Sequence, residues 1–529
     1  MTDPLRANVL TAIKVGIIGL IAGAVYLSGL EHSPVYLAHD EVLFGLQAHA
    51  VAETGRDING NFLPLYFVEP GYSIGRDPLH VYLSALVLKA WPLSAWSIRA
   101  AAALVGVVNI MLMFLVARRV VTPEWLAWAA AAILALTPVH FMHSRLGISV
   151  IYPVPFVIGW LLCVVIYLQQ PQLRWLFAAG LALGCGIYSY LAALVMIPVY
   201  WLASIVALWP RRSMRAIVVV TAGFVLPLSL LAWWHLAHPE RYRDIVNSYR
   251  LYDANRLSPL QGLRDLTSYF SLGERTAVYW QAFNPGRWFF TGDSSLVKST
   301  RLVGLFLMPV APLLLSGLLT VAKRRTTFDL LLVAGLLTAP LPEVLAIKDD
   351  IGRWLVVVPF VVLIATIGAE TMWVSGRRGR RIAAMLLLVA MVPQFVLFYR
   401  DYTTDYRIRS GHWFGGGDTR TAVSEALRLA PEVAFLSDSV LHLEAYWRFY
   451  ALINGARAAA IPTSRVGVKE TPVTDPATRA AYITPLLDDG WSAVLEREGW
   501  RIAARVKNLD GEVAFLVWSH GPLELRPLQ

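Results

Sequence analysis

The chain has 529 residues, of which 57% are hydrophobic and only 16% are charged. Because soluble globular proteins carry about 25% charged residues, this composition excludes an ordinary soluble multi-domain protein. The net charge is +10, but the basic residues cluster at the ends of apolar segments, which is how membrane proteins encode their topology. We therefore expect membrane lipids, and no nucleic acid, among the partners of the chain.

About eleven apolar runs predict transmembrane helices, since about 20 apolar residues are needed to cross the hydrocarbon layer. The first run lacks a cleavage site of small residues, so we expect a retained span and not a removed signal peptide. The predicted spans cover residues 9–30, 98–117, 125–142, 148–168, 174–188, 190–208, 216–236, 301–321, 327–346, 354–373 and 382–399.

Groups of basic residues between the spans predict the orientation of the protein. They are Arg118-Arg119, Arg211-Arg212 with Arg215, Lys323-Arg324-Arg325, and Arg377-Arg378 with Arg380-Arg381. Counting spans from a cytoplasmic N-terminus places all of these groups in the cytoplasm, as the positive-inside rule expects. The same count places the long polar segments at 31–97, 237–300 and 400–529 outside.

The last polar segment predicts a small extracytoplasmic domain over residues 401–529, after a membrane domain over residues 1–400. Residues 432–437 (EVAFLS) have the composition of a strand. Residues 501–519 contain two half-apolar runs around Asp510-Gly511, a dipeptide typical of type I′ hairpin turns. The predicted fold class is therefore an α-helical polytopic membrane protein with a small C-terminal α/β domain.

The first outer segment begins with an acidic pair, Asp40 and Glu41, shortly after the first span. Charge beside a membrane is costly unless it is paired or solvated, so these carboxylates need an explanation. In one interpretation Asp40 caps a helix over residues 42–54. In the other interpretation the pair is catalytic. The two are compatible, because a capping carboxylate is also held in place.

A second charged pair, Arg76 and Asp77, precedes Pro78 and a short apolar stretch that ends at Trp91. The stretch is too short to span, so we predict a helix at the membrane interface, with proline favourable in its first turn. Asp77 is either the cap of this helix or a functional carboxylate that returns to the membrane face of Asp40.

Arg99, Arg145 and Arg353 lie at the outer ends of predicted spans, on the side opposite to the basic groups. Most arginines at span ends extend toward lipid headgroups. A phosphate ligand is the alternative, because a guanidinium binds phosphate in a bidentate manner. Lys348 and Arg353 belong to one short charged hairpin between two spans, which holds them near the membrane plane.

The order of these motifs resembles the GT-C fold glycosyltransferases of the family 39 type. The acidic pair is followed by GRDING, GRDPLHVYLSAL and SIRAAAALVGVVNIMLMFLVARRV, and later by ALTPVHFMHSRLGISV, LALGCGIYSYLAALVMIP and FNPGRWFFTGDSSLVKSTRLVGLFL. Protein O-mannosyltransferases, aminoarabinose transferases of lipid A and bacterial transferases of lipopolysaccharide cores have similar openings. The resemblance covers about residues 1–400.

The resemblance implies an enzyme of the bacterial inner membrane that transfers a sugar from a polyprenyl-phosphate donor. The acceptor would be a glycan, lipid or protein of the envelope, and transfer would occur on the extracytoplasmic face with inversion. The family's catalytic carboxylate matches Asp40, with Glu41 as its neighbour. The substrate-binding positions fall on Arg76, Asp77, Arg145, Lys348 and Arg353.

The chain departs from some relatives in the outer loop after the third span, where they carry a second acid. This loop contains SRLGISVIYP, so either the site has no second acid or Glu41 or Asp77 takes that role. The family implies no fixed cofactor, since some members use a divalent cation and others do not. His140 and His143 have the spacing of metal ligands on a helix, but without a third ligand nearby no metal site is predicted.

A membrane transporter or lipid flippase is the alternative function, because its hydropathy would be similar. Transporters place polar residues at the bilayer midplane and break helices there. Here the span interiors carry few charges, and the polar residues concentrate in the outer segments, which favours the transferase. A relative that only binds glycan or lipid, without catalysis, is a third hypothesis.

Overall fold

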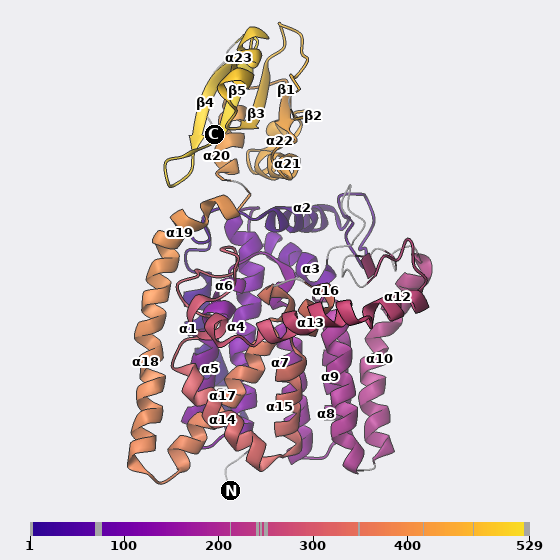
Figure 1. The fold of residues 1–529 in the computed structure, drawn as a ribbon, viewed down its shortest axis with the longest axis vertical. Coiled ribbons are helices and arrows are strands. Elements are labelled where there is room, and N and C mark those ends of the chain that lie inside the picture. Colours follow the sequence, from indigo (N-terminus) through magenta and orange to yellow (C-terminus); the bar gives the residue numbers. More distant parts are fainter. Residues whose placement is uncertain are drawn as a thin grey trace.

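A computed structural model shows the fold and describes residues 4–68, 77–211, 213–239, 243, 246–247, 252–347, 350–415, 417–468 and 470–522. The elements form a bundle of upright helices with a small α/β unit above one end (Figure 1). The N-terminus lies at the opposite end of the bundle from the α/β unit.

The upright helices are α1 (Pro4–Leu27), α4 (Ala95–Val120), α5 (Trp125–Ala135), α7 (Pro153–Gln169), α8 (Leu173–Gly186), α9 (Ala193–Leu208), α10 (Met214–Ala237), α14 (Val310–Arg324), α15 (Thr327–Thr338), α17 (Val357–Val374) and α18 (Arg378–Thr403). Shorter helices lie across the bundle or toward its upper end, namely α2 (His39–Thr54), α3 (Pro78–Leu88), α6 (Pro138–His143), α12 (Pro259–Leu266), α13 (Tyr269–Ala282), α16 (Leu341–Ala346) and α19 (Asp405–Ser410). Single helical turns occur at η1 (Ser149–Ile151), η2 (Trp209–Arg211), η3 (Arg287–Thr291), η4 (Ile351–Trp354) and η5 (Gly411–Trp413).

Every predicted span overlaps a helix, and the mostly helical fold class is confirmed. Among the described residues, 7 helical stretches are long and apolar enough to cross a membrane, and the higher count of spans stays a prediction. The run at 125–142 divides into α5 and α6 at Pro138, because proline removes a helical hydrogen bond and clashes with the preceding turn. The run at 301–321 becomes helical only at Val310.

Glycines let several of the bundle helices touch backbone to backbone. A Cβ on Gly184 of α8 would collide with the carbonyl of Phe224 in α10, and one on Gly317 of α14 would collide with the carbonyl of Ile364 in α17. Small residues at such crossings allow the close van der Waals packing that holds membrane helices together. Packing therefore explains the glycines within the spans.

The connections from α14 to α15 and from α17 to α18 carry two of the basic groups and lie at the N-terminal end of the bundle (Figure 1). The N-terminus and these groups thus share one end, as the count of spans requires. The assignment of that end to the cytoplasm stays a prediction.

The C-terminal unit contains a five-stranded sheet in the order β2-β1-β3-β5-β4. Strands β2, β1 and β3 pair in parallel, while β3, β5 and β4 pair antiparallel. The elements are α20 (Thr419–Arg428), β1 (Val433–Ser437), α21 (Leu443–Ile453), α22 (Ala456–Ala459), β2 (Thr463–Val466), β3 (Ala480–Pro485), α23 (Asp489–Arg497), β4 (Arg501–Lys507) and β5 (Val513–His520). The predicted strand and hairpin are both present, but residues 508–512 form a longer connection than a type I′ turn.

Helix α2 joins the C-terminal unit to the bundle. Val42 and Leu46 of α2 belong to the same buried apolar cluster as Trp447 and Phe449 of α21. The hydroxyl of Tyr446 donates a hydrogen bond of 2.8 Å to the carbonyl of Leu37, just before α2. The two parts of the chain therefore share a core, although the sequence predicted a separate small domain.

Candidate active site

The candidate site begins at the start of α2. This helix starts at His39 with Ala38 as its N-cap residue, so Asp40 lies within the first turn and does not cap it, contrary to the prediction. The capping role falls to Glu41, whose carboxylate accepts the backbone N–H of Ala38 at 2.8 Å. The Asp40 side chain is 40% exposed and lies 3.7 Å from Nε2 of His39.

Glu41, the neighbour of Asp40, is buried and held by donors from distant segments. Arg99 donates from Nε at 2.8 Å and from Nη2 at 3.0 Å, and the backbone N–H of Gly147 donates at 2.8 Å. Both the Glu41 and the Arg99 side chains are no more than 1% exposed. Because the carboxylate oxygens are occupied and shielded, this geometry argues against a catalytic role for Glu41 and indicates a structural one.

Arg145 is also a structural residue in this geometry. Its side chain is buried. Its Nη atoms donate to the backbone carbonyl of Tyr26 in the last turn of α1 and to those of Ser28, Gly29 and Ser33 after it, over 2.7–3.1 Å. The guanidinium also lies over the ring of Tyr402 at 5.7 Å. A donor set directed at protein carbonyls argues against the predicted contact with a lipid phosphate.

Asp77 lies at the N-cap position of α3, but its side chain makes no cap bond. Its carboxylate instead accepts the hydroxyl of Ser149 at 2.5 Å. Ser149 belongs to the loop over residues 147–150, in which Gly147 binds Glu41 and the Val150 side chain packs against Gly352. This short loop therefore brings together the start of α2, the start of α3 and the turn η4.

The turn η4 carries Arg353, whose Nε lies 3.9 Å from a carboxylate oxygen of Asp350. Lys298 forms an ion pair with the same carboxylate. Burial raises the pKa of Asp350, but Lys298 and Arg353 outweigh that effect, and the pKa is lowered overall. The Arg353 side chain is 18% exposed. Arg76 and Lys348, the remaining predicted binding residues, lie outside the described residues.

A buried ionic network, which the sequence did not single out, supports this turn. Arg287 donates to Asp293 at 2.9 Å and to Glu343 at 3.3 Å. The two carboxylates in turn accept the backbone N–H groups of Ile351 at 3.0 Å and Asp350 at 3.0 Å. The network fixes the backbone that carries Arg353. In the sequence, this network is visible only as the two charged residues within FNPGRWFFTGD. The residues with which they pair could not be assigned from the sequence.

An apolar groove, here called the α3–α4 groove, opens near the start of α3. It has a volume of about 440 Å³ and is lined by side chains of α3, α4 and the start of α7. Leu79 and Tyr152 line it, close in sequence to the hydrogen-bonded pair Asp77 and Ser149. Leu86 and Leu104 also line it and are largely exposed, which suits a groove that faces lipid.

One group of residues that could hold a metal ion lies away from this site, among exposed residues of the C-terminal part. Of the described residues, His412, Asp510 and Glu512 have ligand atoms within 4.8 Å of one another. His412 and Asp510 already form an ion pair at 2.7 Å. His140 and His143 are buried. His140 is hydrogen-bonded to the Tyr26 hydroxyl at 2.9 Å, and Nδ1 of His143 lies 2.8 Å from the carbonyl oxygen of Val139.

The fold and the site define a class: a polytopic helical membrane protein with charged residues at one end of the bundle, beside an apolar groove. A profile of the dolichyl-phosphate-mannose-protein mannosyltransferase family matches residues 75–235, which include α3, α4 and the loop over residues 147–150. No curated protein sequence matches the chain.

The same fold occurs in solved structures. ArnT from Cupriavidus metallidurans, in the apo state, aligns with a TM-score of 0.55 at 14% identity over 98% of this chain and 100% of that one. ArnT bound to undecaprenyl phosphate aligns with a TM-score of 0.54 at the same identity and coverage. AglB of Archaeoglobus fulgidus, in complex with an inhibitory peptide and a dolichol-phosphate, aligns with a TM-score of 0.50 at 15% identity. This alignment covers 85% of this chain and 61% of the AglB chain. The chain thus has the GT-C fold, as its motifs predicted.

Proposed function

We propose that this chain is a membrane glycosyltransferase that moves a sugar from a polyprenyl-phosphate donor to an acceptor of the cell envelope. In this proposal Asp40 is the general base, Arg353 binds the donor phosphate, and Asp77 contributes to the substrate site. Glu41 and Arg145 hold the site together without contacting substrate.

One observation carries the proposal: the loop over residues 147–150 joins the segments that bear Asp40, Asp77 and Arg353. A half-exposed carboxylate and a cationic turn are thereby held at one end of the bundle, where the α3–α4 groove faces lipid. A lipid-borne sugar phosphate needs these features together: an apolar channel for its chain, a cation for its phosphate and a base for the incoming hydroxyl. The structures of ArnT with undecaprenyl phosphate and AglB with a dolichol-phosphate support a lipid of this kind.

The reaction is a single displacement at the anomeric carbon. The acceptor hydroxyl attacks C1 of the sugar, its proton passes to Asp40, and the bond between C1 and the phosphate oxygen breaks. The products are the glycosylated acceptor and polyprenyl phosphate, and the attack from the opposite face inverts C1. A positioned base contributes about 10²–10⁴-fold, and Arg353 stabilises the charge that develops on the leaving phosphate.

The proposed location is the bacterial inner membrane, with the charged end of the bundle and the C-terminal part on the extracytoplasmic face. The basic groups at the N-terminal end support this orientation. Reporters fused after Gln529 test it: a periplasmic reporter should be active and a cytoplasmic reporter silent. The reverse result would place Asp40 on the wrong face for an envelope acceptor.

The transporter alternative is tested with purified protein in proteoliposomes that contain radiolabelled polyprenyl-phosphate sugars. Membranes from a deletion strain provide unmodified acceptor. We expect label to move onto envelope material, and we expect lipid-linked sugar to accumulate in the deletion strain relative to its parent. Movement of intact donor between leaflets without transfer would instead identify a flippase.

A further inference from the structure

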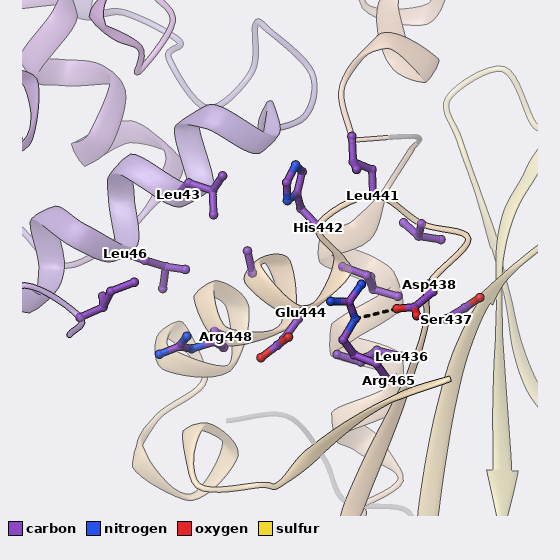
Figure 2. A pocket seen from close by; sticks show the side chains of 14 residues that line it. Leu43, Leu46, Leu436, Ser437, Asp438, Leu441, His442, Glu444, Arg448 and Arg465 are labelled. Atoms are coloured by element: carbon purple, nitrogen blue, oxygen red, sulfur yellow. Dashed lines mark hydrogen bonds and ion pairs between the residues drawn. The ribbon is translucent and has the colours of Figure 1, made fainter. Parts of the chain in front are cut away.

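A second cavity lies between α2 and the C-terminal part, on the side of α2 that faces away from the bundle. It has a volume of about 460 Å³, and we call it the α2–α21 cleft. Leu43 and Leu46 of α2 form one wall, and residues of β1, α21 and β2 form the other (Figure 2). Ligand sites in proteins have volumes of about 300–1,000 Å³, so the cleft is large enough for a small saccharide.

The walls of this cleft are fixed by packing on both sides. Helix α21 buries Trp447 and Phe449 against α2, and the ring of Phe449 comes so close to Gly45 that even a methyl group there would be in tight contact. The Tyr446 hydrogen bond to the carbonyl of Leu37 adds a polar tie. The cleft is therefore a built feature of the fold and not a gap between loosely associated parts.

The polar lining of the cleft combines charges of both signs. Arg465 and Asp438 form an ion pair at 2.6 Å (Figure 2). Glu444 and Arg448, one turn apart on α21, are exposed and line the cleft. Because two acidic and two basic residues cancel, the lining does not select a polyanion. Paired carboxylate and guanidinium groups beside leucine walls suit a neutral sugar, whose hydroxyls need donors and acceptors and whose C–H faces pack on apolar side chains.

One end of the cleft lies next to the helical turn that carries the proposed base. His442 lines the cleft, and its ring stacks on that of His39 with centroids 5.1 Å apart and an interplanar angle of 19°. His39 lies 3.7 Å from Asp40. Burial lowers the pKa of His442, as does the neighbouring His39, while Asp40 raises it. A ligand in the cleft would thus lie beside the turn that carries Asp40.

We propose that the α2–α21 cleft is the acceptor site of the enzyme and binds a neutral saccharide portion of the acceptor. This inference rests on the proposed glycosyltransferase function and deepens it. The donor enters from the lipid side through the α3–α4 groove, while the acceptor lies between α2 and α21 with one hydroxyl directed at Asp40.

The test uses full-length protein in proteoliposomes, radiolabelled polyprenyl-phosphate sugar, and deletion-strain membranes titrated as the acceptor source. Arg448→Ala and Glu444→Gln should each raise the apparent KM for acceptor membranes about tenfold, because each removes hydrogen bonds that involve a charged group. The KM for the donor and the binding of undecaprenyl phosphate should stay unchanged. Arg457→Ala, an exposed residue of α22 that does not line the cleft, is the matched control and should behave as wild type.

A blocking experiment gives an independent readout. The variant Glu444→Cys is made in a Cys163→Ser, Cys185→Ser background, and it should transfer sugar while its thiol is free. Modification of that thiol by a bulky maleimide should abolish transfer but leave the binding of undecaprenyl phosphate intact. Modification of Arg457→Cys in the same background should have no effect. Full transfer by the blocked Glu444→Cys protein would overturn the assignment of the cleft.

The chemical class of the acceptor is tested on the same membranes. Periodate, which cleaves the vicinal diols of sugars, should destroy their capacity to accept label, and proteinase treatment should not. Sensitivity to proteinase alone would mean a peptide acceptor and would overturn the saccharide assignment. If wild-type protein transfers sugar but the cleft variants keep a normal acceptor KM, only this inference fails. If wild-type protein transfers nothing, the proposed function fails first.

Discussion

Two groups of charged residues lie at the same end of the helix bundle but in opposite environments. The buried group consists of Glu41, Arg99 and Arg145, whose hydrogen bonds go to one another or to backbone N–H and C=O groups. The open group contains Asp40 and Arg353, whose side chains are 40% and 18% exposed. Similar residue types at neighbouring positions thus divide into a buried, paired set and a set that is partly exposed.

Adjacency in sequence does not imply a shared environment for two side chains. Asp40 and Glu41 are neighbours in one helical turn, which directs their side chains to different sides of α2. One carboxylate meets Arg99, 58 residues away in the chain, and the other remains partly exposed. Substitutions in the buried group should therefore lower the stability of the protein, and substitutions in the open group should lower its activity.

The largest effect is expected from Glu41→Gln. The change leaves Arg99 buried without its carboxylate partner, and breaking such a pair costs about 3–5 kcal/mol. The protein should unfold at lower temperature in detergent and accumulate poorly in membranes. The double variant Glu41→Leu, Arg99→Met should regain much of the lost stability, since apolar pairs replace buried ion pairs well. A Glu41→Gln protein with wild-type stability but no transfer would make Glu41 a catalytic residue.

Asp40→Asn should lower turnover about 10²–10⁴-fold, because the amide cannot accept the proton of the acceptor. Unfolding should change by less than about 1 kcal/mol, the size of a favourable charge at a helix N-terminus. Sugar transfer at saturating donor measures the first effect, and thermal unfolding measures the second. Turnover within a few-fold of wild type would exclude Asp40 as the base and direct attention to Asp77.

Arg353→Lys should reduce transfer at limiting donor about tenfold, because a lysine keeps the charge but loses bidentate contact with phosphate. Donor titration with radiolabelled polyprenyl-phosphate sugar measures this effect. Arg145→Lys is the matched control in the buried group, and it should lower stability without a selective effect on the donor KM. Normal turnover by the Arg353→Lys protein would show that this arginine serves only as a membrane anchor.

Tyr446→Phe should have the smallest effect. The variant loses the hydrogen bond to the carbonyl of Leu37, which is worth about 1 kcal/mol, while the apolar core between α2 and α21 is kept. Unfolding should shift by that amount, and the turnover of bound substrates should be unaffected. A stability loss as large as that of Glu41→Gln would mean that this hydrogen bond, and not the shared apolar core, holds the C-terminal part on α2.

Local sequence patterns predicted the helical bundle, a short helix after Pro78, a strand over residues 432–437 and a hairpin around Asp510-Gly511, and the structure contains each of these elements. These features depend on local patterns, since long apolar runs, proline at a first helical turn and alternation around Asp-Gly can each be recognised within a short window. The acidic pair at Asp40 and Glu41 and the arginines at span ends were also visible in this way.

Only the tertiary structure decided which of those residues are open. Glu41 is bonded to Gly147, 106 residues later, and Arg145 to Tyr26, 119 residues earlier, so no local pattern could reveal that either was buried. The shared core of α2 and α21 was hidden for the same reason, because Tyr446 and Leu37 are 409 residues apart. Burial and pairing depend on contacts between segments that are distant in sequence, and these contacts separate the residues that hold the site from those that can meet a substrate.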